Sequence, residues 1–132
     1  MGAPAAKLGD QVLATDTHIV LVPSPGGPVP TPVPLPFTGK ILGGCSANVL
    51  VEGKPAAVLG STAQNLPPHV PPAPATFQVP PTDQATIVQG SATVLVNGKP
   101  AARAGDKAQT CNDPAPLPVG TVQATGTVLI GP

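Results

Sequence analysis

The sequence predicts a small all-β domain built from β-hairpin repeats, and three observations lead to this prediction. The 132 residues include 21 prolines and 15 glycines, which interrupt helices. The chain is nevertheless 41% hydrophobic and 9% charged, with no formal net charge, so it should collapse around a core rather than remain disordered. One segment also occurs twice without a gap, each time around a glycine-containing turn.

The repeated segment is a predicted β-hairpin. Residues 46–57 (SANVLVEGKPAA) align with residues 91–102 (SATVLVNGKPAA). The Asn97-Gly98 pair is a strong signal for a two-residue turn, because both turn positions require a positive φ. Glu52-Gly53 occupies the same place in the first copy and is a weaker form of the signal.

A third copy of the unit is divided between the two ends of the chain. Residues 125–131 (TGTVLIG) repeat the first strand, and residues 6–10 (AKLGD) repeat the segment after the hairpin, which reads ARAGD at residues 102–106. We therefore expect the chain to close on itself as three equivalents. The predicted architecture is a small conical pseudo-threefold domain that spans residues 1–132.

Proline-rich excursions separate the hairpins. They cover residues 23–36, 67–81 and 114–118, and each leads into a predicted return strand at residues 37–42, 85–88 or 119–122. We expect these excursions to form loops at the apex of the cone. The alternative is a flexible linker or a polyproline ligand, which their position between matched hairpins disfavours.

The spacing of the repeats predicts a metal site. His18 follows Gly9 by the same number of residues as His69 follows Gly60, and Cys111 comes after the equivalent Gly105. A pseudo-threefold axis would bring these positions together, and imidazole and thiolate groups are ligands of zinc. The alternative is that the two histidines are unrelated surface residues.

Cys45 is a weaker candidate ligand. The alignment of the repeats places it opposite Gly90, at the entrance of the first hairpin and one segment away from His69. A buried structural thiol is the favoured interpretation. A disulfide between Cys45 and Cys111 is not expected in a chain made in the cytosol.

The sequence excludes several function classes. It contains no nucleophile elbow and no phosphate-binding glycine loop, and Asp10 and Asp106 occupy equivalent turns, where aspartate is common. With no net charge and only Phe37 and Phe77 as aromatics, nucleic-acid binding has no electrostatic or stacking basis. The absence of a long apolar run or a secretory signal predicts cytoplasmic synthesis without a membrane span.

Residues 90–106 (GSATVLVNGKPAARAGD) resemble the signature of PAAR-repeat proteins, and residues 100–103 reproduce the tetrapeptide of the family name. Residues 55–58 (PAAV) are a degenerate copy, and the resemblance extends from Lys7 to Gly131. It implies a structural tip, one per trimer, on the VgrG-like spike of type VI secretion systems or related phage-tail-like particles. Such a tip sharpens the spike for envelope puncture and touches the target membrane only transiently.

The resemblance also implies a zinc ion at the apex, typically held by three histidines and one cysteine. His18, His69 and Cys111 would supply three of these ligands. A further histidine is expected just before the Pro-Phe pair, where this chain has Leu35. Water or Cys45 would then complete the site, or zinc would bind weakly or not at all.

An enzymatic role is not expected, because no catalytic extension follows the third copy. The tip would be made in the cytoplasm, assembled on an injection particle and delivered outside the cell or into a target. The competing hypothesis is a proline-rich adaptor that links an effector or other cargo to the spike through residues 23–36.

Overall fold

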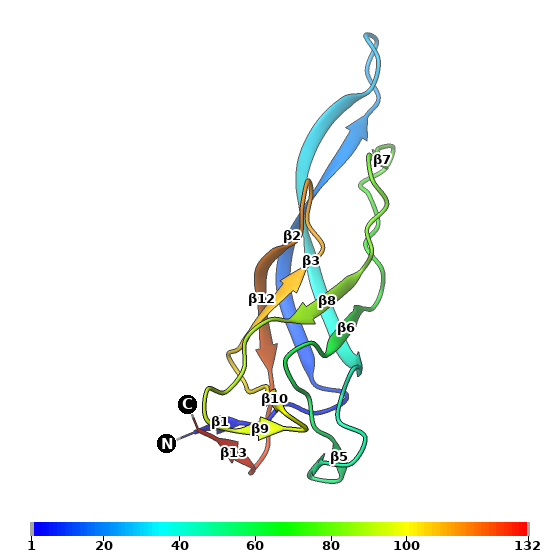
Figure 1. The fold of residues 1–132 in the computed structure, drawn as a ribbon. Coiled ribbons are helices and arrows are strands. Elements are labelled where there is room, and N and C mark those ends of the chain that lie inside the picture. The colour runs from blue at the N-terminus through cyan, green and yellow to red at the C-terminus, as the bar shows by residue number, and fades with distance from the viewer. Residues whose placement is uncertain (1, 132) are drawn as a thin grey trace.

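The computed structural model describes residues 2–131, and these residues form strands but no helix (Figure 1). The predicted all-β class is confirmed. Since the described residues form no helix, they include none long and apolar enough to span a membrane. A closed barrel occupies the middle of the molecule, three small hairpins form its base, and a long two-stranded ribbon extends from its other end.

The barrel is one sheet that closes on itself. Its strands follow the order β12–β11–β8–β6–β3–β2, and β12 pairs again with β2. A short strand, β7, pairs with β2 above the point of closure, at Val20 and Leu21. The bounds are β2 (Gln11–Val22), β3 (Val29–Gly43), β6 (Thr62–Asn65), β7 (Thr76–Phe77), β8 (Gln84–Ile87), β11 (Lys107–Thr110) and β12 (Leu117–Gln123).

The barrel interior combines a few large side chains with alanines. Phe37, Ile41 and Ile87 are its largest fully buried apolar residues. Each of the three shortest barrel strands contributes one buried alanine to the same core, namely Ala63, Ala85 and Ala108. Alternating large and small residues fill a narrow barrel without voids, which explains how a core without tryptophan or tyrosine is packed.

Three hairpins form the base, as predicted. They are β4 (Leu50–Val51) with β5 (Lys54–Pro55), β9 (Leu95–Val96) with β10 (Lys99–Pro100), and β13 (Leu129–Ile130) with β1 (Ala3–Pro4). Because β1 and β13 come from opposite ends of the chain, the third copy is completed by circular closure.

A ring of backbone hydrogen bonds relates the three copies. Ala57 N donates to Ala6 O, Ala102 N donates to Ala57 O, and Ala6 N donates to Ala102 O, at 3.0, 3.0 and 2.9 Å. Each copy therefore contacts the next through the same residue of the repeat. This cyclic pattern is the pseudo-threefold axis that the repeats predict.

The turns after each hairpin also match. Asp10 Oδ2 accepts from Lys7 N at 3.0 Å, and Asp106 Oδ2 accepts from Arg103 N at 2.8 Å. In the remaining copy Ser61 Oγ accepts from Val58 N at 2.9 Å. The two aspartates thus have the turn-forming role that the sequence indicates, and serine replaces aspartate where valine replaces the basic residue.

The prediction that residues 23–36 form a loop is wrong from Val29 onward. β3 begins at Val29, earlier than the predicted return strand, and pairs with β2 in unbroken register from Val22↔Val29 to Gln11↔Lys40. Prolines usually end a ladder because they lack an N–H donor. Here they recur at every second position, so a single side of the strand lacks donors and the other side remains free to pair.

Gly98→Val should lower the free energy of unfolding by about 1–3 kcal/mol. Asn97 and Gly98 both have positive φ, 53° and 80°, as the predicted primed turn requires. No heavy atom lies within 4 Å of a Cβ added at Gly98, so the cost is backbone strain and not a clash. Thermal unfolding measures it.

Gly26→Val is the matched control for this substitution. Gly26 also has open space around an added Cβ, but its φ is not in the positive range. We expect the control to unfold close to the wild type. Equal unfolding of the two variants would contradict the proposed origin of the strain.

Candidate metal centre

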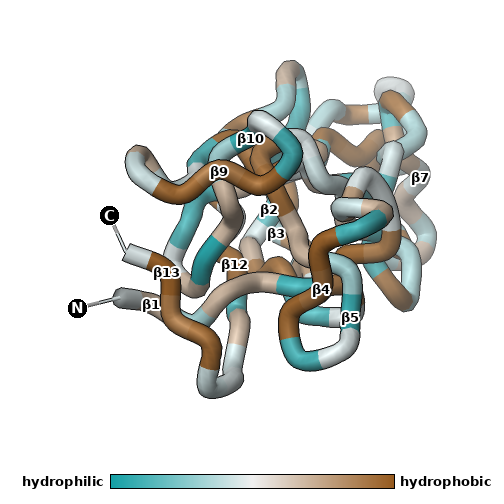
Figure 2. Tube along the Cα trace, turned by 60° about the horizontal axis from the view of Figure 1, so that its bottom comes forward, coloured by the Kyte–Doolittle hydropathy of each residue, from teal (hydrophilic) through white to brown (hydrophobic). Residues whose placement is uncertain are grey.

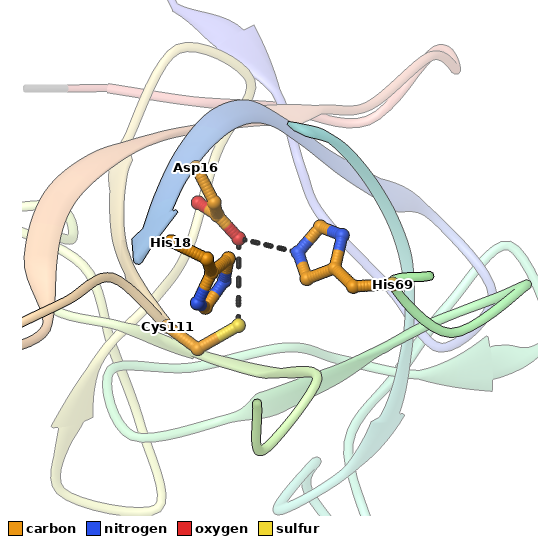
Figure 3. Close-up of side chains that lie close together, drawn as sticks. All are labelled: Asp16, His18, His69 and Cys111. Atoms are coloured by element: carbon orange, nitrogen blue, oxygen red, sulfur yellow. Dashed lines mark hydrogen bonds and ion pairs between the residues drawn. The ribbon is translucent and has the colours of Figure 1, made fainter. Parts of the chain in front are cut away.

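Four buried side chains converge where the barrel gives way to the ribbon: Asp16, His18, His69 and Cys111 (Figure 3). One ligand atom from each lies within 4.8 Å of the corresponding atoms of the other three. The structure therefore brings together all three residues that the repeat spacing selects, and it adds Asp16.

Strand periodicity positions two of the four. Asp16 and His18 are two residues apart on β2, and alternate residues of a strand share a face. Their partners across the ladder are Leu35 and Val33 of β3. Cys111 directly follows Thr110, the last residue of β11, so two strands, β2 and β11, position three of the four groups.

His69 comes from the loop between β6 and β7, and Asp83 holds this loop in place. Asp83 Oδ1 accepts from the backbone N of His69 at 2.9 Å and from Asn65 Nδ2 at 3.1 Å. The His69 ring then lies with Nε2 3.0 Å from Asp16 Oδ2. These contacts orient the imidazole toward the cluster.

The unpaired ring nitrogens of His18 point most directly to a bound ion. The residue is 1% exposed, yet neither ring nitrogen has a hydrogen-bond partner. The nearest carboxylate oxygen, Asp113 Oδ2, is 3.4 Å from Nδ1 and accepts instead from the backbone N of Ile19. Because a buried polar atom without a partner is costly, a bound cation is the natural complement of this imidazole.

Asp16 is the centre of the polar network. It is fully buried and accepts from Thr110 Oγ1, from Cys111 Sγ at 3.4 Å and from Asn112 Nδ2 at 3.4 Å. A buried carboxylate requires such donors or a cation, because its desolvation is otherwise very unfavourable.

The thiol of Cys111 is protonated at neutral pH when no metal is bound. Burial, followed by the negative charge of Asp16, raises the pKa of Cys111 to about 11. The thiol then donates to Asp16, and a metal would replace this proton.

The donor set consists of two imidazoles, one thiolate and one carboxylate, all of which are zinc ligands in proteins. A tetrahedral zinc ion needs four ligands, and this group supplies four without water. The residues present therefore fit zinc, and they fit it without Cys45.

Cys45 lies elsewhere in the structure. It is half-buried, its Sγ is 3.9 Å from Gly43 O, and it lines a hollow with Val58 and Asn97 next to the base hairpins. Both cysteines are free thiols, so the disulfide is absent, as expected. Burial raises the pKa of the Cys45 thiol, which suits the structural role that the sequence favours.

The sequence reasoning missed Asp16, although a signal was present. Asp16 is the only acidic residue of β2, and it precedes His18 by the strand period of two. It also lies directly across the ladder from Leu35, the position at which a further histidine was expected. The fourth donor therefore comes from the neighbouring strand.

A family model described as the PAAR motif matches residues 21–114 and also residues 78–131. The two matches together cover most of the chain, including both complete hairpin copies. Two of the four clustered residues, His69 and Cys111, lie in the matched ranges, whereas Asp16 and His18 precede them. No curated protein matches the chain.

Proposed function

Because the chain belongs to the PAAR-motif family, whose members are structural spike-tip proteins associated with VgrG-type spikes of type VI secretion, we propose that it caps such a spike. In this proposal one chain sits on one trimer, residues 1–132 act as a single tip domain, and the far end leads through the envelope. The role is structural and needs no catalysis.

The observation that carries the proposal is the pattern of apolar exposure on the base. Leu50, Leu95 and Leu129 occupy the same position in the three hairpins and are 60%, 61% and 59% exposed. Single exposed leucines are ordinary on protein surfaces. Three equally exposed leucines related by a cyclic repeat are a surface of defined symmetry, and the apolar segments of the hairpins around it are visible in Figure 2.

A partner with true threefold symmetry is the natural complement of this surface. A trimer offers the same contact three times around its axis, and one pseudo-threefold chain can use all three contacts at once. A partner without threefold symmetry would not repeat the same contact at all three leucines. The absence of net charge indicates that apolar contact dominates the binding, which should therefore vary little with salt.

The metal cluster lies between the barrel and the ribbon that would lead such a tip. We propose that Asp16, His18, His69 and Cys111 hold one zinc ion, which would tie β2, the β6–β7 loop and the end of β11 together. When bound, the ion supplies a tetrahedral crosslink between segments that have little core of their own. Asp16, His18, His69 and Cys111 would bind the ion. The side chains of Thr110 and Asn112 donate hydrogen bonds to the Asp16 carboxylate and so orient it.

Co-expression with a trimeric spike protein tests the function. We expect a complex with one chain per spike trimer in native mass measurements. A complex with three chains per trimer, or no complex with any trimeric spike of this class, would contradict the proposal.

A triple substitution of the base leucines by aspartate should weaken the complex at least about hundredfold, because each exposed anchor loses its apolar contact. The matched control replaces Val29, Val70 and Val79 by aspartate, since these valines are 49%, 71% and 54% exposed but lie outside the hairpins. Calorimetry on both variants decides the matter. Equal weakening in the two would show that the base leucines are not the docking surface.

The structure of β3 weighs against the competing adaptor hypothesis. Residues 29–36 are paired with β2 along their length, so they are not free to act as a polyproline ligand.

A further inference from the structure

The β2–β3 ribbon projects beyond the barrel (Figure 1), and the outer edge of its upper part is open. β3 pairs with β2 from Val29 to Lys40, but it pairs with β6 only from Gly39 to Gly43. Over residues 29–36 no described strand covers the other side of β3. An open strand edge is a template on which another chain can add a strand.

Hydrogen bonds of β2 reveal which way the prolines of β3 face. Thr17 N donates to Asn112 Oδ1 at 2.8 Å, and Ile19 N donates to Asp113 Oδ2 at 2.9 Å. The backbones of Thr17 and Ile19 therefore point away from β3. Residues directly opposite one another in an antiparallel ladder either both face their partner strand or both face away, and these two lie opposite Pro34 and Pro32.

The lower end of the same strand gives the same orientation. Thr38 N donates to Asn65 Oδ1 at 2.9 Å, and Thr38 O accepts from Leu66 N at 3.2 Å. Thr38 thus faces outward, away from β2. Since orientation alternates along a strand, Pro30, Pro32, Pro34 and Pro36 all face outward as well.

The open edge therefore presents carbonyl acceptors but no N–H donor at four successive outward positions. An added antiparallel strand needs donors and acceptors from both partners, and proline supplies only the acceptor. The opposite edge of the ribbon is already occupied, because Asn112, Asp113 and β7 cover it at Thr17, Ile19 and Leu21.

Within residues 17–39 the edge is blocked by proline and not by charged side chains. Exposed edges are commonly blocked by charged side chains, above all lysine, but residues 17–39 contain no aspartate, glutamate, lysine or arginine. The remaining residues of the edge, Val29, Thr31, Val33 and Leu35, favour strands. Without the prolines, the segment would be an uncharged, strand-forming edge with nothing to prevent pairing.

We propose that the alternating prolines of β3 close the ribbon edge to strand addition, and that the strand they exclude is the same edge of a second copy of this chain. Two identical edges can pair antiparallel about a twofold axis, so each copy would offer the other a matching length of strand. The inference does not depend on the proposed function, because it follows from the backbone orientation and the composition of β3.

The test restores donors to the edge. In the full chain Pro30, Pro32 and Pro34 are replaced together by threonine, which has a higher strand propensity. All three prolines are exposed, so the barrel core is untouched. Sedimentation over a range of concentrations should show a monomeric wild type and a variant whose self-dissociation constant is at least about tenfold lower. Hydrogen exchange should show concentration-dependent protection at positions 30, 32 and 34.

The control variant makes the same change in composition away from the edge, with threonine at positions 25, 72 and 80. These three prolines are also exposed and lie outside all strands. The proposal is overturned if the control associates as strongly as the edge variant, or if a folded edge variant stays as monomeric as the wild type. If circular dichroism shows that the triple variant is unfolded, the single Pro32→Thr variant, which restores one N–H donor, takes its place. Its self-association is then compared with that of the wild type and of the control.

Discussion

Removal of the proposed zinc ion should lower the free energy of unfolding by about 4 kcal/mol, the stabilisation expected when free zinc exceeds its dissociation constant about a thousandfold and binds only the folded chain. In a domain of this size the melting temperature should fall by roughly 10–20 °C. Protein purified without added metal should contain about one zinc ion per chain. Elemental analysis measures the zinc content. Calorimetry before and after treatment with a chelator measures the changes in melting temperature and in the free energy of unfolding.

The two cysteines supply a matched pair of variants. Cys111→Ser removes a donor from the cluster, whereas Cys45→Ser changes a half-buried thiol outside it. We expect the first variant to lose zinc together with the chelator-sensitive part of its stability, and the second to keep both. Full zinc content in Cys111→Ser would exclude the proposed site.

Asp16→Asn tests the negative charge of the carboxylate separately from its hydrogen bonds. The amide preserves the shape of the side chain but lacks the charge that favours a metal ion. We expect weaker zinc binding in a chain that still folds, because the Thr110 hydroxyl can still donate to the remaining carbonyl oxygen. Zinc affinity equal to that of the wild type would show that Asp16 is not a ligand.

Zinc binding should also release a proton from Cys111. The pKa of about 11 keeps the metal-free thiol protonated well above neutral pH, and only the thiolate binds zinc. The apparent affinity should therefore rise about tenfold per pH unit across the neutral range and fall as the pH is lowered. Calorimetry in buffers of different ionisation enthalpy detects the released proton. Binding heats that do not depend on the buffer would argue against this ligand.

Phe37→Ala should lower the free energy of unfolding by about 3–5 kcal/mol, the usual cost of removing a buried phenylalanine. Phe37 is 1% exposed and is the largest fully buried side chain of the barrel. Neighbouring Gly39 leaves room for its ring, since a Cβ at that position would lie 2.6 Å from Phe37 Cε1. The alanines around it cannot expand into the space, so a cavity would remain. Chemical denaturation measures the loss.

Phe37→Ala should also loosen the metal cluster, because its ring lies 6.0 Å from the His69 ring, centroid to centroid. Phe77→Ala is the control for stability only, since Phe77 is half-buried at the short strand β7 and its own ring lies 5.8 Å from the His18 ring. We expect a smaller loss of stability from Phe77→Ala. Equal losses from the two substitutions would mean that the barrel core is not centred on Phe37.

The base of the molecule was predictable from sequence because the residues that specify each hairpin are close together along the chain. A hairpin is specified by the Asn97-Gly98 turn and the apolar residues on either side, all within one short segment. The near-identity of two segments, with half-copies at the chain ends, then predicts the threefold arrangement. The ring of hydrogen bonds through Ala6, Ala57 and Ala102 realises it.

The metal cluster was predictable only in part. His18, His69 and Cys111 occupy related places in the repeats, and the axis brings them together. Asp16 has no counterpart in the other copies, so the repeat alignment gave no reason to select it. Its role depends on the pairing of β2 with β3, which puts it opposite Leu35.

The sequence alone determined the hairpins, their number and three of the clustered residues, because turn chemistry and repeat spacing act along the chain. The tertiary structure alone decided that β12 returns to β2, that residues 29–36 form a strand, and that their prolines face outward. Proline composition predicts a loop, since proline removes a donor. Whether that loss matters depends on which side of the strand has a partner, and only the register with β2 settles this.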